Sequence, residues 1–316
     1  MKLVVQIPCL DEEKTLPLVI KSIPRSIPGI DKIEILVIDD GSSDNTVQVA
    51  KDLGVEHFVR HVKKQGLGKS FHDGTMKCLE MGADIIVNTD GDNQYPQEKI
   101  TALVKPILDG QSDIVIANRQ THRIKHFSLK KKILQKIGTA VVNKAAGTKV
   151  PDAVSGFRAY SRESIFKLNA ITRYSYTIET IIQAGYKSLH IESIDIDTNP
   201  KTRESRLFKN DFEHIFISAL TIIRAYIMYK PYIIFGWLGT SFFLLGLIPF
   251  ARFAIYSVSE GTTQGHIQSL LIGSLLMVAA LLCLVMNIVA DLIRTNRILT
   301  EDNLEQTKRI RFNSHS

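Results

Sequence analysis

The stretch "NTDGDNQYP", residues 88–96, directly follows the apolar run "ADIIV" at residues 83–87. An apolar run of this length predicts a buried strand, and residues two apart in a strand point to the same face. Asp90 and Asp92 therefore present two carboxylates together at the carboxyl end of a strand. Taken alone, the stretch is explained equally well by a polar turn, since Asp, Gly and Asn are common turn residues. The rest of the chain decides between these interpretations.

Short apolar runs alternate with segments of helical spacing in the first part of the chain. The runs are "KLVVQI", "KIEILVIDD", "EHFVRH", "ADIIVNTD" and "SDIVIANR", with the helical patterns "EKTLPLVIKSI", "DNTVQVAKDLG", "GKSFHDGTMKCLEMG" and "QEKITALVKPILDG" between them. This alternation predicts an α/β fold whose mostly parallel sheet is covered on both faces. Ligands bind such sheets outside the carboxyl ends of the strands. "IDDGSSD" and "NTDGDNQ" both fall at that edge, so they predict a single site.

The chain is basic, with a formal net charge of +7 and a sequence pI near 9.2. This balance favours an anionic partner, which leaves nucleic acid, an acidic membrane surface and phosphorylated small molecules open. The three cysteines are scattered and form no metal-ligand pair, which is typical of a reducing compartment. The N-terminal apolar run breaks at Pro8 and meets acidic residues, so it is interpreted as a first strand and not as a signal peptide.

The composition changes after residue 230, where two uncharged apolar runs occupy residues 231–251 and 267–290. A bilayer-spanning helix needs roughly 20 apolar residues, so both runs predict transmembrane helices; a pair of buried core helices is the alternative. Basic residues flank the pair on its outer sides, and the loop between the runs has one arginine. The positive-inside rule then places the N-terminal domain and the basic tail, residues 291–316, in the cytoplasm.

The segment at residues 207–230 carries an apolar stripe at helical spacing. Its members are Phe208, Phe212, Ile215, Phe216, Ala219, Leu220 and Ile223. The stripe predicts an amphipathic helix that lies in the membrane interface or packs on the N-terminal domain, and the pattern does not separate these two placements.

Two known acidic or glycine-rich motifs are excluded by the letters themselves. A calcium-binding EF-hand loop beginning at Asp90 would need Gly at its sixth position and Glu at its twelfth, but these positions hold Tyr95 and Thr101. A phosphate-binding P-loop ending in "GLGKS" would need its first Gly at position 63, which holds Lys63. The remaining interpretation is Mg²⁺ or Mn²⁺ held mainly by substrate phosphates, which takes only one or two protein carboxylates. Gln94 could then orient a water or a phosphate.

A second acidic loop, "VIDDGSSDNT", ends the next strand along the sheet edge. Asp44 is explained by helix capping. Asp39 interrupts a buried apolar run at the sheet edge, where its carboxylate could accept a hydrogen bond from a base or a ribose. We therefore favour a ligand-binding role for Asp39.

Five stretches in order, "IPCLDEEKTL", "VIDDGSSDNT", "QGLGKSFHDG", "TDGDNQYP" and "SGFRAYSRE", resemble family 2 glycosyltransferases, which have the nucleotide-sugar-binding GT-A fold. With the two apolar runs, the chain resembles the dolichyl- or polyprenyl-phosphate sugar transferases. The resemblance implies a Rossmann-like GT-A domain at residues 1–206. It also implies inverting transfer of one sugar from a UDP- or GDP-sugar to a polyprenyl phosphate at the cytoplasmic face, with Mg²⁺ or Mn²⁺ and without nucleic acid. Some members of the family form homo-oligomers through their membrane helices.

The resemblance also implies roles for individual residues. The first-strand loop would line the nucleotide, Asp39 would recognise the base, and the Asp-x-Asp (DxD) motif with Gln94 would hold the metal and the diphosphate. An arginine after the fifth apolar run would lie near the sugar and phosphates, and a basic motif would meet the acceptor phosphate. The residues of the first-strand loop are Pro8, Leu10 and Glu12, and the base-recognising residue is Asp39. The DxD motif consists of Asp90 and Asp92, and Gln94 follows it. The arginine near the sugar is Arg119, and the basic residues for the acceptor phosphate are Arg203, Arg206 and Lys136.

Three other functions compete with a phosphate acceptor. A glycosyltransferase with a hydroxyl acceptor, such as a glycolipid or cell-surface glycan, would need a base carboxylate, for which Asp152 is the candidate. A polysaccharide synthase would resemble a pattern that ends in an arginine-tryptophan acceptor motif. It is disfavoured because the one tryptophan, Trp237, lies inside an apolar run. A scaffold or flippase component is disfavoured because the acidic motif is intact. A phosphate monoester needs no base, because its second pKa is about 6.

Overall fold

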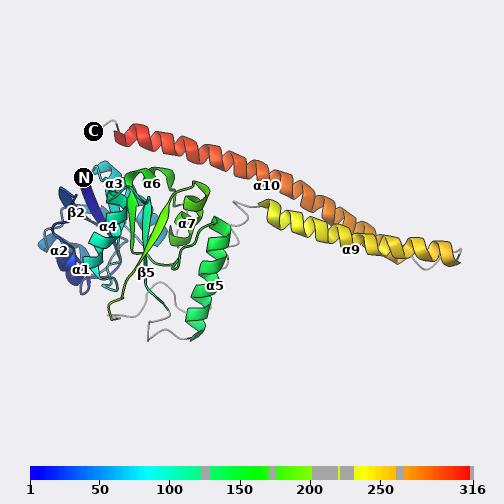
Figure 1. Cartoon of the computed structure of the whole chain (residues 1–316), viewed down its shortest axis with the longest axis horizontal. Coiled ribbons are helices and arrows are strands. Elements are labelled where there is room, and N and C mark those ends of the chain that lie inside the picture. Colours follow the sequence, from blue (N-terminus) through cyan, green and yellow to red (C-terminus); the bar gives the residue numbers. More distant parts are fainter. Residues whose placement is uncertain (122–128, 171–175, 201–219, 221–230, 261–266, 314–316) are drawn as a thin grey trace. The chain divides into compact units, whose positions relative to one another are not determined.

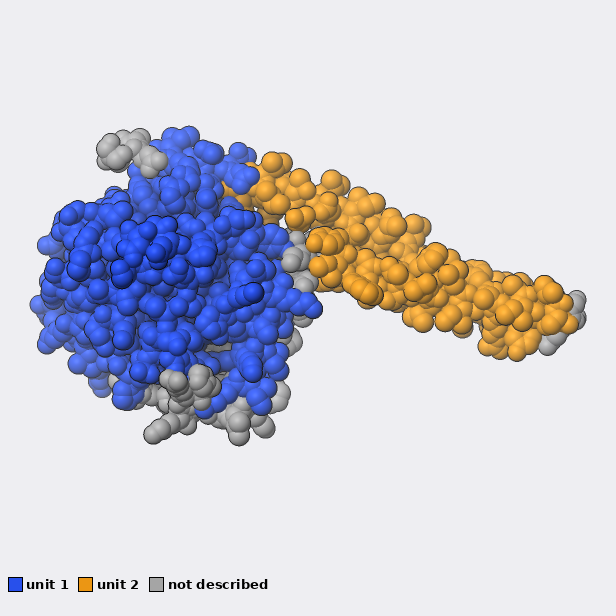
Figure 2. All heavy atoms as spheres, in the orientation of Figure 1, with its two compact units in different colours: residues 1–222, 302–316 blue, residues 223–301 orange. Residues whose placement is uncertain are grey.

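The computed structural model describes residues 1–121, 129–170, 176–200, 220, 231–260 and 267–313. The chain divides into two compact units, which Figure 2 shows in different colours. The first unit, here called the head, comprises Met1–Ile222 with Asp302–Ser316, and the second comprises Ile223–Glu301. Each is described by itself.

The head is built on a seven-stranded sheet within the described residues, in the order β3-β2-β1-β4-β6-β5-β7. All of the strand pairs are parallel except those of β6, which runs antiparallel to β4 and β5. The mostly parallel sheet predicted from the sequence is therefore confirmed. Its strands are β1 (Lys2–Cys9), β2 (Lys32–Asp39), β3 (His57–Arg60), β4 (Ile85–Asn88), β5 (Ile114–Asn118), β6 (Arg158–Ser161) and β7 (Ile191–Asp195).

Helices cover both faces of this sheet (Figure 1). The bounds in the head are α1 (Leu16–Ser22), α2 (Thr46–Asp52), α3 (Leu67–Glu80), the 3₁₀ turn η1 (Gln97–Lys99), α4 (Ile100–Leu108), α5 (Leu129–Ala146), α6 (Arg162–Lys167) and α7 (Tyr176–Tyr186). One face of β1 packs into a core with apolar residues of α1 and α4. On the opposite face, α3 approaches so closely that a Cβ on Gly74 would lie 2.6 Å from the Gln6 side chain. Alternate residues of the central strands are thus buried on two sides, which explains their continuous apolar letters.

Pro8 opens the sheet at its carboxyl edge. The ladder between β1 and β4 ends at the pair Gln6↔Asn88, and the Thr89 N–H donates to the Gln6 carbonyl at 3.1 Å. Residue 8 would present its N–H to the same side as residue 6, but proline has none. The two strands therefore stop pairing there.

The second unit contains α9 (Pro231–Glu260) and the first part of α10 (Ile267–Asn313). Small residues let these helices approach closely: a Cβ on Gly246 would lie 3.2 Å from that of Leu276, and one on Gly273 would lie 3.0 Å from the Phe250 ring. Both helices are long and apolar enough to cross a membrane, and their apolar stretches are almost entirely exposed. This exposure distinguishes them from the core helices of a soluble protein, which are mostly buried.

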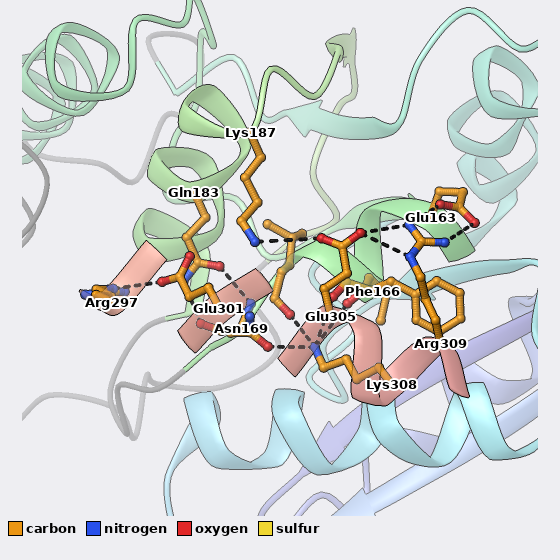
Figure 3. Close-up of polar contacts among 12 residues, drawn as sticks. Glu163, Phe166, Asn169, Gln183, Lys187, Arg297, Glu301, Glu305, Lys308 and Arg309 are labelled. Carbon is orange, nitrogen blue, oxygen red and sulfur yellow. Dashed lines mark hydrogen bonds and ion pairs between the residues drawn. The ribbon is translucent and has the colours of Figure 1, made fainter. Parts of the chain in front are cut away.

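The last part of α10, residues 302–313, belongs to the head and is bound to it by a buried lysine. Lys308 is 4 % exposed, and its ammonium donates to the main-chain carbonyls of Ile165 (3.3 Å), Phe166 (3.5 Å) and Leu168 (2.8 Å) and to Asn169 Oδ1 (2.7 Å). Figure 3 shows these contacts. The ammonium caps the carboxyl end of α6, where a positive charge is favourable. The region expected only as a basic tail is thus helical to Asn313.

Neighbouring residues of α10 strengthen this attachment. Arg309 donates to both carboxylate oxygens of Glu163 at 2.6 and 3.1 Å, and its guanidinium lies 5.0 Å from the centre of the Phe166 ring. Arg162 donates to the Phe312 carbonyl at 3.0 Å, and Phe312 is buried. The Arg309 guanidinium lowers the pKa of Glu163 below its usual value.

Candidate active site

Three parallel strands, β1, β2 and β4, deliver their following loops to one place. The Asp40 N–H donates to the Cys9 carbonyl at 2.9 Å, and Thr89 is joined to Gln6 in the same way. A Cβ added to Gly91 would lie 3.1 Å from Cys9 Sγ and 3.2 Å from Glu12 Cγ. The loops that follow β1 and β4 are therefore packed against each other.

The first-strand loop is held in shape by the loop that follows β2. Asp11 adopts a positive φ of 55°, and its main-chain N–H donates to Ser42 Oγ at 2.9 Å. The Glu12 N–H donates to Thr46 Oγ1 at 2.7 Å, and the buried Glu12 carboxylate accepts from Thr15 Oγ1 at 2.7 Å. A left-handed residue is strained unless its surroundings fix it, as they do here. The predicted residues Pro8, Leu10 and Glu12 thus stand on a rigid turn.

Asp39 and Asp40 have separate tasks. Asp39 is 2 % exposed, and its Oδ1 accepts the Ser42 N–H at 2.9 Å, which turns the chain away from the strand end. Asp40 accepts the N–H groups of Gln65 (2.8 Å) and Gly66 (2.9 Å). It also lies 2.7 Å from His61 Nδ1. No role for Asp40 was predicted from the sequence, where its position next to Asp39 in "IDDG" was the only signal. It fixes the "QGLG" loop that begins α3.

The DxD loop is ordered by its own members. Asp92 accepts the main-chain N–H of Gln94 at 3.1 Å and the Gln94 side-chain amide at 2.9 Å. Asn93 between them has a positive φ of 59°, a conformation that asparagine tolerates better than most residues. Asn199, which follows β7, donates to the Asn93 carbonyl at 3.0 Å. The loop is therefore a built structure that places Asp92 and Gln94 together.

Asp90 lies against the start of β6. A Cβ on Gly156 would lie 3.3 Å from both carboxylate oxygens of Asp90 and 3.2 Å from the Tyr176 hydroxyl. Asn88 donates to that hydroxyl at 2.7 Å and to the Gly156 carbonyl at 2.9 Å. The Gly156 N–H donates to the Tyr95 hydroxyl at 3.0 Å, and burial raises the pKa of Tyr95 to about 12. The sequence did not predict these contacts, because Gly156 and Tyr176 come from distant parts of the chain and meet Asn88 and Tyr95 only in the folded head.

Gly156 therefore makes a sharp test of the geometry around Asp90. We expect Gly156→Ala to lower transferase activity at least tenfold, because the methyl group crowds the Asp90 carboxylate and must displace it or Tyr176. Gly138→Ala is the matched control, since a Cβ on Gly138 meets nothing within 4 Å. Initial rates and apparent melting temperatures of both variants check the expectation. Equal activity of the two variants would contradict it.

Arg119 and Asp152 form a buried ion pair. Arg119 Nε donates to Asp152 Oδ2 at 2.7 Å and Nη2 donates to Oδ1 at 2.9 Å. The side chains are 13 % and 5 % exposed. Burial alone would raise the pKa of Asp152, but the two guanidinium bonds outweigh it and hold that pKa below its usual value. Asp152 is thus bonded to Arg119 through both carboxylate oxygens, and its lowered pKa makes it a poor general base.

The other basic residues predicted to act near the site differ in where they lie. Lys136 is exposed on α5, and Arg203 and Arg206 lie outside the described residues. Asn199, four residues before Arg203, is joined to the DxD loop through the Gln94 carbonyl at 3.0 Å. Arg158, in the "SGFR" stretch, is fully buried and donates to the main chain of Ser155, Thr177 and Ala153. Its guanidinium is a structural clamp for the loop before β6.

The donor set suits a divalent ion that substrate phosphates help to hold. Within the described residues, no three His, Cys, Asp or Glu side chains are grouped to hold a metal. Asp90 and Asp92 supply two carboxylates, and the Gln94 amide orients one of them. Mg²⁺ and Mn²⁺ prefer oxygen ligands and, at nucleotide sites, take one or two carboxylates with phosphates and water. The residues present therefore fit such an ion.

Comparison with known proteins gives a family for this fold and site. The profile of glycosyl transferase family 2 matches residues 4–168. A UDP-N-acetylglucosamine–dolichyl-phosphate N-acetylglucosaminyltransferase of Methanococcus voltae is 28% identical over 213 residues, which cover 61% of this chain and 83% of that protein. A dolichol-phosphate mannosyltransferase of Pyrococcus furiosus is 30% identical over 199 residues, covering 60% of this chain and 54% of that protein.

Solved structures show the same fold. Glucosyl-3-phosphoglycerate synthase of Mycobacterium tuberculosis, in complex with Mn²⁺, UDP and glucosyl-3-phosphoglycerate, superposes with a TM-score of 0.54 at 23% identity, covering 71% of this chain and 78% of that one. The same enzyme with Mg²⁺ and UDP gives 0.54 at 22% identity, covering 70% and 79%. The head thus has the GT-A fold.

Proposed function

Because this chain belongs to glycosyl transferase family 2, and is a glycosyltransferase, we propose that it transfers one sugar from a UDP- or GDP-sugar to a polyprenyl phosphate. Two of these relatives support the acceptor by their names, which pair a sugar with dolichyl phosphate or dolichol phosphate. The two apolar helices, α9 and α10, support a lipid acceptor independently, since they suit a membrane protein.

The donor site is assigned to the loops at the carboxyl edge of the sheet. Pro8, Leu10, Glu12 and Asp39 would line the nucleoside, because they stand on the rigid turns that follow β1 and β2. Asp90, Asp92 and Gln94 would hold Mg²⁺ or Mn²⁺ together with the diphosphate. Such an ion, when bound, neutralises charge on the leaving diphosphate. The chain's own part is to keep the two carboxylates at a fixed spacing, through Gln94 on one and Gly156 beside the other.

The observation that supports the acceptor assignment is the buried ion pair between Asp152 and Arg119. A hydroxyl acceptor must lose its proton to a general base, and the candidate base here has both oxygens bonded to Arg119 and a lowered pKa. A phosphate monoester arrives already ionised and needs no such base. Arg119, with Lys136, Arg203 and Arg206, would supply the positive charge that holds a phosphate.

The direct test uses the purified full-length protein with Mg²⁺, undecaprenyl phosphate and a panel of radiolabelled UDP- and GDP-sugars. Transfer of label into the organic phase with one donor would establish the acceptor class, the nucleotide and the sugar together. Nucleotide binding without transfer to any polyprenyl phosphate would point to a hydroxyl acceptor. Absence of both binding and transfer would refute the proposed function.

The pH dependence of the reaction separates the two acceptor classes further. We expect the rate to rise as the pH increases through about 6, where the acceptor phosphate loses its second proton. Asp152 contributes no titration in that range, because its lowered pKa keeps it ionised at every pH above the usual carboxyl range. Rates measured from pH 5 to 8 check this expectation. The expectation would be contradicted if Asp152→Asn changed the dependence of the rate on pH without lowering the stability of the protein.

We infer that the head and residues 291–316 lie in the cytoplasm, with spans at residues 231–251 and 267–290. The basic residues on the outer flanks of the two runs support this orientation by the positive-inside rule. The amphipathic helix predicted at residues 207–230 lies outside the described residues, except for Leu220. Protease protection of inverted membrane vesicles tests the orientation, since the head should be cleaved from the cytoplasmic side only.

A further inference from the structure

Helix α5 has an inward face that fixes how it sits on the head. Val142, Ala145 and Ala146 are buried, and α7 packs so tightly that a Cβ on Gly185 would lie 2.0 Å from the Ala146 carbonyl oxygen. The Asn143 side chain bonds both main-chain groups of Val150 at 2.8 and 2.9 Å. The helix, shown in green in Figure 1, is therefore held in one rotational position.

The opposite face of α5 is apolar and exposed. Ile133 (55 %), Leu134 (39 %), Ile137 (56 %) and Val141 (37 %) are spaced three, four and seven residues apart, so they form one stripe on the helix. Single exposed apolar residues are ordinary on a protein surface, but a continuous stripe marks a contact surface. This stripe belongs to the head, whose other helices were interpreted as cover for the sheet.

The charges around the stripe identify its partner. Residues 129–149 contain lysines at 130, 131, 132, 136, 144 and 149 and no aspartate or glutamate. Lys136 and Lys144 are exposed. A second copy meeting this face about a two-fold axis would bring these lysines against their own counterparts. An apolar stripe with basic flanks instead matches an anionic bilayer, into which the stripe inserts while the lysines stay at the headgroups.

The position of α5 in the chain ties this surface to the candidate active site. The segment that contains it follows Arg119 and ends at Asp152, and these two residues are joined by bonds of 2.7 and 2.9 Å. We propose that the exposed face of α5 inserts into the headgroup–acyl boundary of an anionic bilayer and so keeps the Arg119–Asp152 end of the site at the lipid surface. Membrane contact of the head then does not depend on the two spans alone.

The insertion is tested by fluorescence in the full-length protein, reconstituted in nanodiscs of phosphatidylcholine and phosphatidylglycerol. The only tryptophan is removed by Trp237→Phe, and a new one is placed by Ile137→Trp. We expect lipids brominated on the upper acyl chain to quench its fluorescence. The matched control is Val62→Trp, because Val62 is fully exposed on the head, and it should not be quenched. Equal, absent quenching of both variants would overturn the proposal, and cross-linking between copies through Ile137→Cys would then assign the stripe to a second chain.

A kinetic measurement adds a consequence of the insertion, and this part rests on the proposed function. The Ile133→Ser/Ile137→Ser variant should raise the KM for undecaprenyl phosphate roughly tenfold, because the site is no longer held at the lipid surface. The KM for the nucleotide sugar should not change. Quenching of the Ile137→Trp variant without any transferase activity would refute the proposed acceptor and leave the membrane surface standing. An unchanged acceptor KM together with absent quenching would overturn the membrane surface itself.

Discussion

Replacement of Asp92 by Asn should lower sugar transfer by about 100- to 1,000-fold, the effect expected when one group that stabilises the developing charge is lost. The substitution keeps the shape of the side chain and an oxygen that can accept the Gln94 N–H, which Asp92 accepts at 3.1 Å. It removes the negative charge that a divalent ion needs. The loss should therefore appear without unfolding of the loop.

Two measurements assign this loss to the metal. Binding of UDP and GDP, measured by calorimetry with and without Mn²⁺, should lose its metal dependence in the variant. Asp109→Asn is the control, because Asp109 is an exposed carboxylate that accepts a hydrogen bond from Lys105 at 3.0 Å on the surface of α4. Full transfer by Asp92→Asn, or an equal loss in Asp109→Asn, would remove Asp92 from the metal assignment.

Replacement of Arg119 by Met should damage both stability and activity. Asp152 would keep a buried charge without the two N–H groups that it now accepts, and breaking a buried pair in this way costs about 3–5 kcal/mol. For a domain of this size, the loss corresponds to a fall of about 10 °C in the apparent melting temperature. Thermal unfolding followed by intrinsic fluorescence in detergent measures it.

The double variant Arg119→Met/Asp152→Leu separates the two effects. Removing both partners leaves no unpaired charge, so most of the stability should return. Activity should stay low if Arg119 also holds the phosphates, because no guanidinium is restored. Recovery of activity together with stability would show that the pair serves only to close the loop between residues 119 and 152.

The fold was predictable because its signals are local. The apolar runs that became β1, β4 and β5 are nearly continuous, since these strands are buried on both faces, and the same holds for β2 from Leu36 onward. The acidic loops were located for a related reason: parallel strands end at a shared edge, so "IDDGSSD" and "NTDGDNQ" had to meet. Membrane spans follow from length and composition alone.

The supports of the site could not be predicted from these patterns. Tyr176, Gly156 and Asn88 are brought together by tertiary packing, through hydrogen bonds between residues 20 to 88 positions apart. Nothing in the letters around Asp152 showed that Arg119 would neutralise it, so it remained a candidate base. Likewise, the spacing of "LKKKILQKIGTAVVNKAAG" defines two apolar faces of α5 but does not say which face the head would cover.

The buried end of α10 sets an order for biosynthesis. Lys308 and Phe312 complete the packing around α6, yet they leave the ribosome after both apolar helices have been made. The head is therefore a domain whose packing is completed by residues translated after both apolar helices, whereas most domains close as their own segment emerges. A chain that terminates early would leave the carboxyl end of α6 uncapped and the Phe166 ring without Arg309, which gives cellular proteases a means of recognising incomplete copies.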